Sequence, residues 1–210
     1  QGNCQFVMLL RRLASTLVRK PAPHSTTTAL MPDGTFAQFD SSMRLRDSYW
    51  LLLFYPLDWT FVCPTELLAF SAAAGKFAEA GCQLLAASVD SEYSHLAWTR
   101  QKREEGGLGG PLAFPMLADV RRQVAQHFGV LDAEAGVALR GLFVGDRRGI
   151  VRHAAVTDLG VGRSVAEALR IVQAVQFADT HDGTVCPADW TPGQETIDVA
   201  DAGKYFKSRK

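Results

Sequence analysis

Two apolar runs separated by one helical segment constrain the fold of this chain more than any other feature. Residues 50–55 and residues 82–89 contain no charged side chain, which is typical of strands that are buried on both faces of a sheet. Residues 64–80, between these runs, have a helical composition that ends at Gly81. The pattern predicts a βαβ unit with two parallel strands.

Further segments extend this unit to a complete α/β domain. Residues 146–149 (Asp-Arg-Arg-Gly) form a turn-forming tetrad, which indicates a hairpin between the strands on either side. In chain order, the segments after the βαβ unit are a helix that begins at Ser91, a helix over residues 119–128, strands over residues 142–144 and 150–156, and an amphipathic helix over residues 164–178. This order predicts an α/β sandwich of the thioredoxin type.

Size and charge exclude several classes of protein. A chain of 210 residues that is 47% hydrophobic can bury one full core without help from disulfides or a metal. Its 22 basic and 22 acidic residues cancel, so no overall positive field would recruit nucleic acid or an anionic membrane surface. The longest apolar runs are far shorter than the about 20 residues that cross a bilayer. We therefore expect small molecules and proteins as partners, and neither nucleic acid nor membrane.

The N-terminal segment, residues 1–20, is expected to be a basic leader outside the folded domain. Gln1-Gly2 has the form of a remnant of a protease-cleaved tag, and Met8 is a candidate natural start. No acidic residue precedes Asp33, and the segment carries the basic residues Arg11, Arg12, Arg19 and Lys20. This composition predicts the short leader of a cytoplasmic protein, with a mitochondrial presequence as the alternative.

The four cysteines do not form a disulfide scaffold, and no pair has the CxxC spacing of a dithiol or zinc site. Cys82 opens the second apolar run, where we expect an inert packing residue, and Cys4 has no expected role. Cys63 differs because Pro64 follows it, at the start of the predicted helix. Unpaired backbone N–H groups and the helix dipole favour a thiolate at such a position, and a thiolate is a nucleophile.

Metal sites, nucleotide sites and hydrolase centres are not expected. The 5 histidines form no HxxxH or HExxH pair, and no Gly-x-Ser-x-Gly elbow is present. His95 lies in a predicted helix beside Leu96 and Trp98, which favours a structural role. The glycine cluster at residues 106–110 lacks the Gly-Lys-Ser/Thr ending of a phosphate-binding loop. We predict no metal and no organic cofactor.

Residues 55–66 (Tyr-Pro-Leu-Asp-Trp-Thr-Phe-Val-Cys-Pro-Thr-Glu) resemble the active-site run of the typical two-cysteine peroxiredoxins, thiol peroxidases of the alkyl-hydroperoxide-reductase-like class. The resemblance covers residues 21–206 and continues through residues 90–98, 106–110, 139–143, 161–164 and 185–187 to Tyr205-Phe206. It implies a thioredoxin-like peroxidase domain over residues 21–180 and a C-terminal arm over residues 181–210.

The resemblance implies roles for the residues around Cys63. Cys63 would be the peroxidatic cysteine, which attacks hydrogen peroxide or an organic hydroperoxide and becomes a sulfenic acid. Pro56 would shield its thiolate, Thr60 would hydrogen-bond the peroxide, and Arg140 would stabilise the thiolate and the transition state by its charge. Glu66 would orient the arginine, unless it is a first-turn acid that only stabilises the helix dipole.

Cys186 would be the resolving cysteine. In the family this cysteine comes from the partner subunit of a head-to-tail homodimer and forms an intersubunit disulfide with the peroxidatic cysteine. A thioredoxin-like protein then reduces the disulfide. Five dimers would associate into a decamer. The alternative function is a holdase chaperone or a peroxide-signalling relay, and a thiol-disulfide oxidoreductase is disfavoured because the chain has no CxxC.

Two further elements resemble regulatory parts of eukaryotic peroxiredoxins. They are Gly106, Gly107, Leu108 and Gly109 of the glycine cluster, and the terminal pair Tyr205 and Phe206. In the family these elements slow local unfolding, so that the sulfenic acid can meet a second peroxide and become sulfinic acid. We therefore expect inactivation at high peroxide, although the cluster taken alone also fits a plain surface loop.

The chain departs from the family pattern at a few positions. Gly160 stands where a proline is usual, and Ser25 stands where the family commonly has phenylalanine. The stretches 109–115 and 181–185 each contain one extra residue. We expect Gly160 to loosen a loop near the subunit interface and Ser25 to remove an apolar anchor, and neither to touch the catalytic residues.

Overall fold

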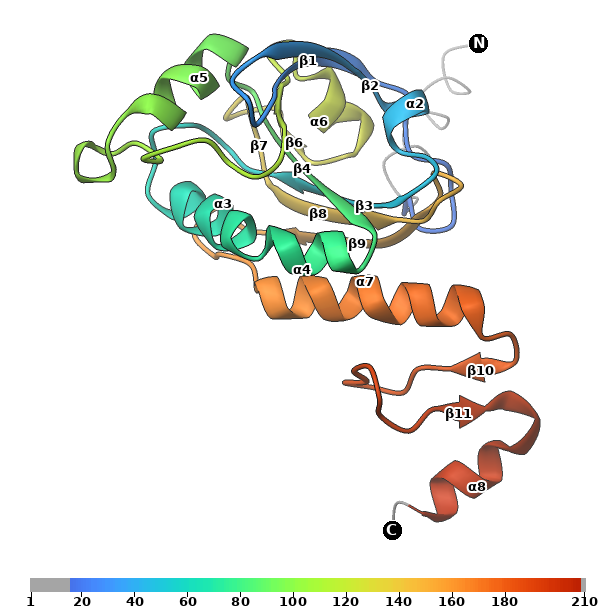
Figure 1. The fold of residues 1–210 in the computed structure, drawn as a ribbon. Coiled ribbons are helices and arrows are strands. Elements are labelled where there is room, and N and C mark those ends of the chain that lie inside the picture. Colours follow the sequence, from blue (N-terminus) through green and yellow to red (C-terminus); the bar gives the residue numbers. More distant parts are fainter. Residues whose placement is uncertain (1–15, 209–210) are drawn as a thin grey trace, which may run out of the picture.

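A seven-stranded sheet forms the centre of the protein, of which the computed structural model describes residues 16–208 (Figure 1). The strand order is β2-β1-β5-β4-β3-β8-β9. β3 (Tyr49–Phe54) runs parallel to β4 (Cys82–Ser88), and β4 runs parallel to β5 (Met116–Ala118). The predicted βαβ unit with parallel strands is therefore confirmed in the middle of the sheet.

The predicted hairpin is also confirmed. β8 (Arg140–Gly145) and β9 (Val151–Thr157) pair antiparallel. The carboxylate of Asp146 accepts the backbone N–H groups of Arg148 and Ile150, at 2.9 and 3.1 Å, and so closes the turn between them. This local capping explains why a short polar tetrad was sufficient to predict the turn.

A second hairpin, at the opposite edge of the sheet, was not predicted. β1 (Thr26–Leu30) pairs antiparallel with β2 (Phe36–Asp40), and β1 also pairs with β5. The sequence of β1 is Thr-Thr-Thr-Ala-Leu, and its burial rises along the strand without alternating. A strand of this kind has no periodicity of two, which is the property that sequence patterns detect.

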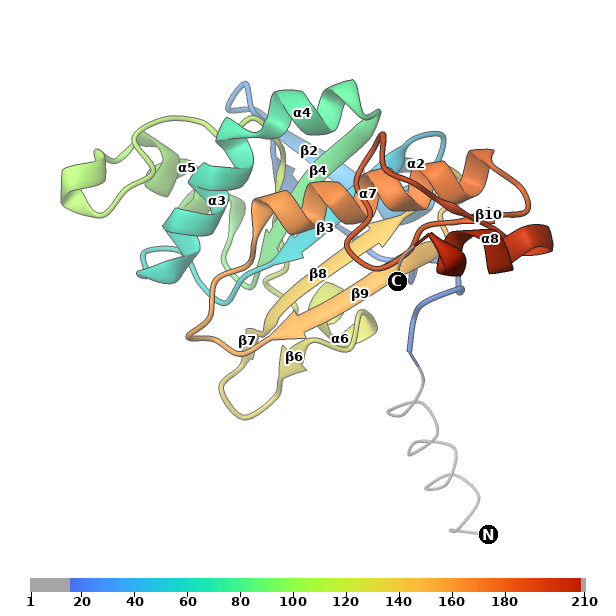
Figure 2. The same cartoon turned by 90° about the horizontal axis from the view of Figure 1, so that it is seen from below.

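Helices cover both faces of the sheet, with α3, α4 and α7 together on one face (Figure 2). The helices are α2 (Ser41–Arg44), α3 (Val62–Ala72), α4 (Ala74–Glu79), α5 (Glu92–Arg100), η1 (Arg103–Glu105), α6 (Gln123–His127), α7 (Val165–Thr180), η2 (Val199–Asp201) and α8 (Ala202–Lys207). None of the helices among the described residues is long and apolar enough to cross a membrane.

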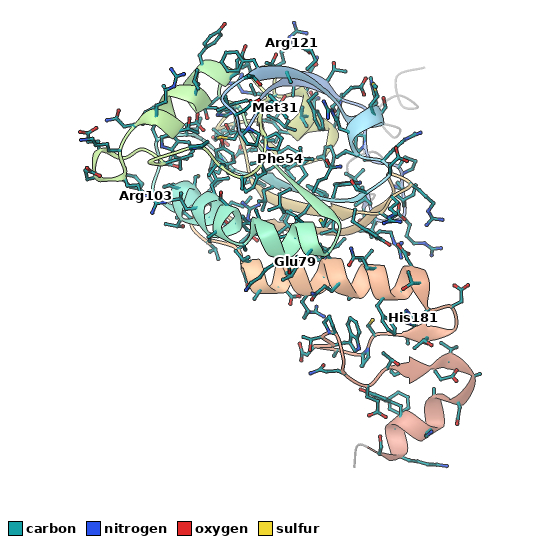
Figure 3. All side chains as sticks on the ribbon, viewed as in Figure 1. Met31, Phe54, Glu79, Arg103, Arg121 and His181 are labelled. Atoms are coloured by element: carbon teal, nitrogen blue, oxygen red, sulfur yellow. The ribbon has the colours of Figure 1, made fainter. Side chains whose placement is uncertain are left out.

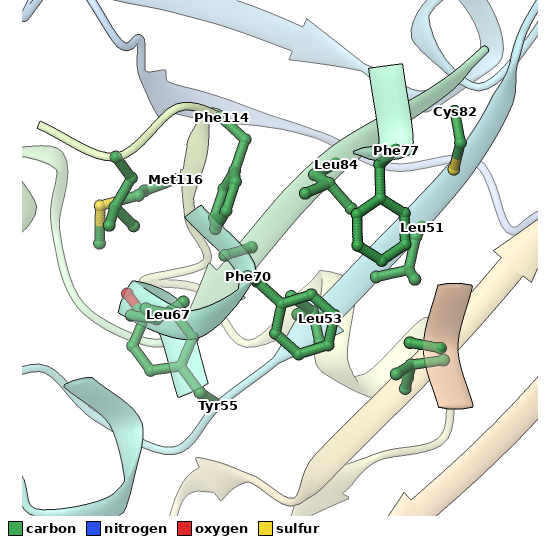
Figure 4. Close-up of a cluster of buried hydrophobic side chains, with 14 of the residues drawn as sticks. Leu51, Leu53, Tyr55, Leu67, Phe70, Phe77, Cys82, Leu84, Phe114 and Met116 are labelled. Carbon is green, nitrogen blue, oxygen red and sulfur yellow. The ribbon is translucent and has the colours of Figure 1, made fainter. Parts of the chain in front are cut away.

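The sheet separates two apolar layers because successive strand residues point to opposite faces. In the first layer, Phe70 of α3 and Phe77 of α4 pack over Leu51 and Leu53 of β3 (Figure 4). In the second layer, Leu52 of the same strand packs with residues of α6. The loop between the end of β3 and the start of α3 carries Pro56 and Thr60.

The single helix predicted over residues 64–80 is wrong, because the structure divides it into α3 and α4 with Ala73 between them. Gly75, in the first turn of α4, has a low helix propensity, which favours a break at this point. α3 also begins two residues earlier than predicted, at Val62. Pro64 therefore lies inside the first turn, where a missing backbone N–H costs no hydrogen bond.

The helix predicted over residues 119–128 begins too early, because α6 begins only at Gln123, whereas its end at His127 agrees closely with the prediction. The side chain of Asp119 accepts the N–H groups of Val124 and Ala125, at 3.0 and 2.7 Å. Arg122, directly before α6, has a left-handed backbone with φ of 59°. The acid therefore caps a helix that starts later, instead of occupying its first turn. The helix starts predicted at Ser91 and Ser164 are confirmed, since both hydroxyls accept a backbone N–H as N-caps.

A C-terminal arm follows α7 and extends away from the sheet (Figure 1). It contains the two-stranded sheet of β10 (Thr184–Val185) and β11 (Ile197–Asp198), and then η2 and α8. A small hairpin of β6 (Leu131–Asp132) and β7 (Val137–Ala138) completes the elements.

The last residues of the leader are not outside the folded domain, which corrects the boundary expected at residue 20: the backbone N–H of Arg19 donates to the carbonyl of Val151 at 2.7 Å, and the N–H of Val151 donates to the carbonyl of Lys20 at 2.9 Å. The other expectations about the leader lie outside the described residues. These are the interpretation of Gln1-Gly2 as a tag remnant, the start at Met8, the absence of a role for Cys4, and the basic residues Arg11 and Arg12.

Candidate active site

Cys63 is the second residue of α3, at the start of the helix that follows β3. The N-cap of α3 is Phe61, and no side chain caps the helix there. The first N–H groups of the helix therefore have no side-chain acceptor, and their partial positive charge faces the region of the sulfur. The Cys63 side chain is buried with 0% exposure.

Arg140 lies against this sulfur. It is the first residue of β8, two positions before Leu142, which pairs with Leu53 of β3. This register places Arg140 beside the C-terminal end of β3, where the loop to α3 begins. Its Nη1 lies 3.4 Å from Cys63 Sγ, and the arginine side chain is only 3% exposed. A buried guanidinium beside a sulfur provides a fixed positive charge for a thiolate.

Glu66 supplies the counter-charge for this arginine. It follows Cys63 by three residues, so both side chains lie on the same face of α3. Its Oε2 accepts Arg140 Nη1 at 2.9 Å. Burial alone would raise the pKa of Glu66, but the hydrogen bonds and charge of Arg163, with the charge of Arg140, hold that pKa below its ordinary value of 4.5. The position fits an orienting role better than a dipole role alone.

Arg163 is a site residue that sequence reasoning missed. Its backbone N–H and its Nε both donate to Glu66 Oε1 at 2.7 Å, and its Nη2 donates to Glu66 Oε2 at 2.9 Å. Its Nη1 donates to the carbonyl of Gly141 at 2.6 Å. Two arginines therefore share one buried carboxylate. The only sequence hint was an arginine directly before the N-cap Ser164, within a motif that resembles the family.

The loop that contains Gly160 also reaches the site, which corrects an expectation from the sequence. Arg140 Nε donates to the carbonyl of Leu159 at 2.7 Å. Gly160 follows that residue directly, so flexibility at this glycine bears on the position of Arg140. Ser25 likewise does more than remove an apolar anchor, since it is buried and its Oγ lies 3.0 Å from His127 Nδ1.

Thr60 and Pro56 lie on the loop between β3 and α3. Thr60 Oγ1 donates its proton to the carbonyl of Leu57 at 2.9 Å. The lone pairs of this hydroxyl can therefore accept a hydrogen bond from a peroxide O–H. Pro56 is buried directly after Tyr55. The structure places both residues on the segment that leads into Cys63.

Cys186 lies in the C-terminal arm, directly after β10. Its Sγ donates to the carbonyl of Ala174 in α7 at 3.8 Å. Burial raises the pKa of the Cys186 thiol, and the charge of Arg170 opposes that rise. Both Cys63 and Cys186 are free thiols. Two views place β10 at the far end of α7 from α3, so the structure does not bring the two sulfurs together within one chain (Figures 1 and 2).

Trp190 and Arg170 hold the arm against α7. The Trp190 side chain is 3% exposed and packs on Phe177, with ring centroids 4.8 Å apart. Arg170 Nη1 donates to the carbonyl of Trp190 at 3.2 Å. Cys186 is therefore in a docked segment, which must move before its sulfur can reach another thiol.

The glycine cluster is a packed loop and not a loose surface loop. Backbone N–H groups of Leu108 and Gly109 donate to the carbonyls of Trp98 and Gln101, both at 2.9 Å. A Cβ on Gly107 would lie 2.1 Å from the Gln101 carbonyl oxygen, so only glycine fits there. This close approach fixes the loop to the end of α5.

The terminal pair lies in α8, with Tyr205 buried and Phe206 63% exposed. Arg103, beside the glycine cluster, and His181, where the arm begins, lie on opposite sides of the view in Figure 3. α8 extends still further along the arm (Figure 1). Within one chain, the structure does not bring Tyr205 and Phe206 to the glycine cluster.

Two further candidates, Cys82 and His95, are buried. Cys82 is buried among apolar residues, and burial raises its pKa to about 12, which fits an inert packing residue. His95 is fully buried. In the part of the chain from 16 to 208, no group of three or more histidine, cysteine, aspartate or glutamate side chains could hold a metal ion.

Comparisons with known proteins agree with this geometry. The profile of the AhpC/TSA family matches residues 18–154, and the profile described as the C-terminal domain of 1-Cys peroxiredoxin matches residues 174–207. The chain is 53% identical over 191 residues to peroxiredoxin-2 of Cricetulus griseus, covering 90% of this chain and 94% of that relative. It is 48% identical over 195 residues to peroxiredoxin-1 of Gallus gallus, covering 92% and 96%.

A solved structure matches over a similar range. The reduced 2-Cys peroxiredoxin of Plasmodium vivax superposes with a TM-score of 0.83 at 39% sequence identity, covering 87% of this chain and 93% of that chain. The two matched profile ranges include Cys63, Arg140 and Cys186.

Proposed function

The chain belongs to the AhpC/TSA family of peroxiredoxins, and we propose that Cys63 and Arg140 carry its peroxidase reaction. The protein is a thiol peroxidase with the thioredoxin-like fold of that family. The observation that carries the residue assignment is the buried contact of 3.4 Å between Arg140 Nη1 and Cys63 Sγ. A positive charge fixed beside a sulfur at a helix start favours the thiolate, which is the reactive form.

In the first step, the Cys63 thiolate attacks the terminal oxygen of a peroxide. The sulfur supplies two electrons, an S–O bond forms, the O–O bond breaks, and the sulfur becomes a sulfenic acid. The departing oxygen takes a proton and leaves as water or as an alcohol. Arg140 faces the charge that moves from the sulfur to this oxygen, which is where preorganised donors contribute most to catalysis.

Two loop residues would position the peroxide. The Thr60 hydroxyl, whose own proton is directed to the Leu57 carbonyl, would accept the O–H of the peroxide. Pro56, which is buried on the same loop, would exclude water from the thiolate.

We propose that Cys186 of a second copy of the chain completes the cycle. Its thiolate would attack the sulfenic sulfur, the S–S bond would form as the S–O bond breaks, and the departing hydroxide would take a proton from solvent and leave as water. A thioredoxin-like dithiol protein would then reduce the disulfide by exchange. The free state of both thiols and the position of the arm at the far end of α7 support a partner chain as the source of the second sulfur.

Replacing Cys186 by serine tests this cycle. With a thioredoxin-type reductant, we expect Cys186→Ser protein to consume one peroxide per Cys63 and then stop, because no disulfide forms for the reductant to reduce. Wild-type protein should turn over continuously and run as a disulfide-linked dimer on a non-reducing gel. Continuous turnover by the variant with the same reductant would exclude the proposed role of Cys186.

We propose that the homodimers assemble further into a decamer and that the protein acts in the cytoplasm, with a mitochondrial location as the alternative. The family membership supports the oligomer, and the basic leader bears on the location. No feature of residues 16–208 favours a holdase or a signalling relay over the peroxidase.

We further propose that the glycine cluster and Tyr205-Phe206 slow the release of the arm. Deleting Tyr205 and Phe206 with the residues after them should speed disulfide formation, because the resemblance to eukaryotic peroxiredoxins implies that this pair slows the local unfolding that must come first. The peroxide concentration that inactivates half of the enzyme during turnover should then rise. The formation of sulfinic acid at Cys63, followed by intact-mass measurement, reports this change. An unchanged peroxide tolerance of the truncated protein would contradict the proposal.

A further inference from the structure

A buried polar pair lies beneath the loop that carries Pro56 and Thr60. Asp58 of this loop and His95 of α5 are both 0% exposed, and His95 Nδ1 lies 2.8 Å from Asp58 Oδ2. A buried carboxylate is unfavourable unless it is paired and fully hydrogen-bonded. The pair joins the active-site loop to a helix from a different part of the chain.

Both carboxylate oxygens and the backbone N–H of Asp58 are hydrogen-bonded. Its Oδ1 accepts the hydroxyl of Tyr55, and its Oδ2 accepts Ser94 Oγ, both at 2.8 Å. Its backbone N–H donates to Asp90 Oδ2, also at 2.8 Å. The position of Asp58 is therefore determined from the sheet, from α5 and from the segment between them. The loop cannot shift at this residue without breaking several buried hydrogen bonds.

Trp59, the next residue, is held by the same helix. Its backbone is left-handed with φ of 57°, a conformation that a bulky residue keeps only when its surroundings impose it. Its Nε1 donates to Ser94 Oγ at 3.3 Å, and Ser94 in turn donates to Asp58. Thr60 follows directly. The path of the chain from Asp58 to Thr60 is thus set by α5, through the residue pair Ser94 and His95.

We propose that His95 is a positioning residue for the peroxidase reaction. It fixes Asp58 and, through the two residues that follow, places Thr60 for contact with a peroxide at Cys63. Its second ring nitrogen, Nε2, lies 3.3 Å from the carbonyl of Leu117 in β5, so the ring braces the loop against the sheet. The inference rests on the proposed role of Cys63, but concerns only the placement of the loop.

Loss of the His95 contacts should slow the reaction of Cys63 with peroxide without slowing every reaction of this cysteine. A displacement of about 1 Å in a group that orients the substrate can lower a rate by about 10²-fold. The reaction with peroxide needs both the thiolate and the loop. Alkylation of Cys63 by iodoacetamide needs the thiolate and its charge partner, but not a bound peroxide. The rate of alkylation should therefore stay nearly unchanged in a variant that reacts more slowly with peroxide.

Two matched variants test the proposal. His95→Asn keeps an N–H close to the position of Nδ1, so it can still donate to Asp58. His95→Gln places its amide near the position of Nε2. No N–H then lies near the position of Nδ1 to donate to Asp58. Both remove the ring from the core. For reduced protein in stopped flow, we expect His95→Gln to lower kcat/KM for hydrogen peroxide by about 10²-fold and His95→Asn by only a few-fold. The iodoacetamide rate should change little in either variant.

Stability controls separate positioning from a general loss of structure. Val124→Ala, on the buried face of α6 in the second apolar layer, should lower the melting temperature without lowering the peroxide rate. The proposal is wrong if the two His95 variants lose activity equally, or in proportion to their melting temperatures. If His95→Gln does not fold, Tyr55→Phe removes one donor to Asp58 and should show a smaller loss in the same step. A wild-type protein without reactivity at Cys63 would instead refute the proposed function.

Discussion

Cys63→Ser protein is expected to consume hydrogen peroxide no faster than buffer. Serine has nearly the same shape, but its hydroxyl stays protonated beside Arg140 at neutral pH, and oxygen cannot be oxidised to the equivalent of a sulfenic acid. The loss should be complete with any reductant, because it precedes the resolving step. Peroxide consumption measured with an electrode or a dye, together with the absence of any mass increase after peroxide treatment, checks this result.

Cys82→Ala is the matched control. Cys82 is also buried, but burial raises its pKa to about 12, and the hydrogen bond its sulfur makes is to the carbonyl of the adjacent Gln83, at 3.7 Å. Removing it should cost about 1 kcal/mol of stability, the typical effect of a single substitution. The peroxide rate should stay within about a factor of two of wild type, as for independent sites. Loss of activity in this variant as well would show that the Cys63 result reports misfolding.

The parts of the fold that could be predicted are those with local causes. Gly81 ends a helix, while Ser91 and Ser164 start helices, because each acts on backbone groups within four residues of itself. Asp119 also accepts backbone N–H groups at a helix start, but the sequence predicted it as the first residue of the helix. Its side chain instead reaches forward to the N–H groups of Val124 and Ala125, in a helix that starts later. Sequence patterns identify a cap more readily than the turn it caps.

The active site was predicted only in part, because sequence patterns again detect local features and not contacts between distant segments. Cys63 stands at a helix start, which sequence can detect. The triad of Glu66, Arg140 and Arg163 comes from three segments that meet only through the sheet register and the loop before α7. Arg140 was found through the family resemblance, and Arg163 was missed because no local pattern pairs it with a carboxylate 97 residues away.

The partner of His95 was missed for a related reason. Apolar neighbours correctly favoured a structural role, but nothing in the helix sequence indicates that a loop carboxylate, Asp58, lies 37 residues before it in the chain and 2.8 Å away in space. A buried polar contact of this kind depends on the assembled fold, so its chemistry emerges only when both segments are placed.

Arg140→Lys is expected to lower kcat/KM for peroxide by about 10²-fold to 10³-fold, the range found for removal of one preorganised donor. Arg140 meets three groups at once: Cys63 Sγ at 3.4 Å, Glu66 Oε2 at 2.9 Å and the Leu159 carbonyl at 2.7 Å. A single ammonium keeps the charge but cannot reproduce this planar fork. Stopped-flow oxidation of reduced protein at several peroxide concentrations measures the effect.

Arg140 can act in two ways, which differ in how far Arg140→Lys lowers the rate of alkylation of Cys63 and the rate of its reaction with peroxide. If it only favours the thiolate, iodoacetamide alkylation of Cys63 and the reaction with peroxide should fall together in Arg140→Lys protein. We expect the peroxide rate to fall further, because the guanidinium also meets charge that develops on the departing oxygen. Arg152→Lys, in an ion-pair network with Asp146 and Asp179, is the control and should change neither rate. Full peroxide reactivity in Arg140→Lys protein would mean that the geometry of the fork is not needed for catalysis.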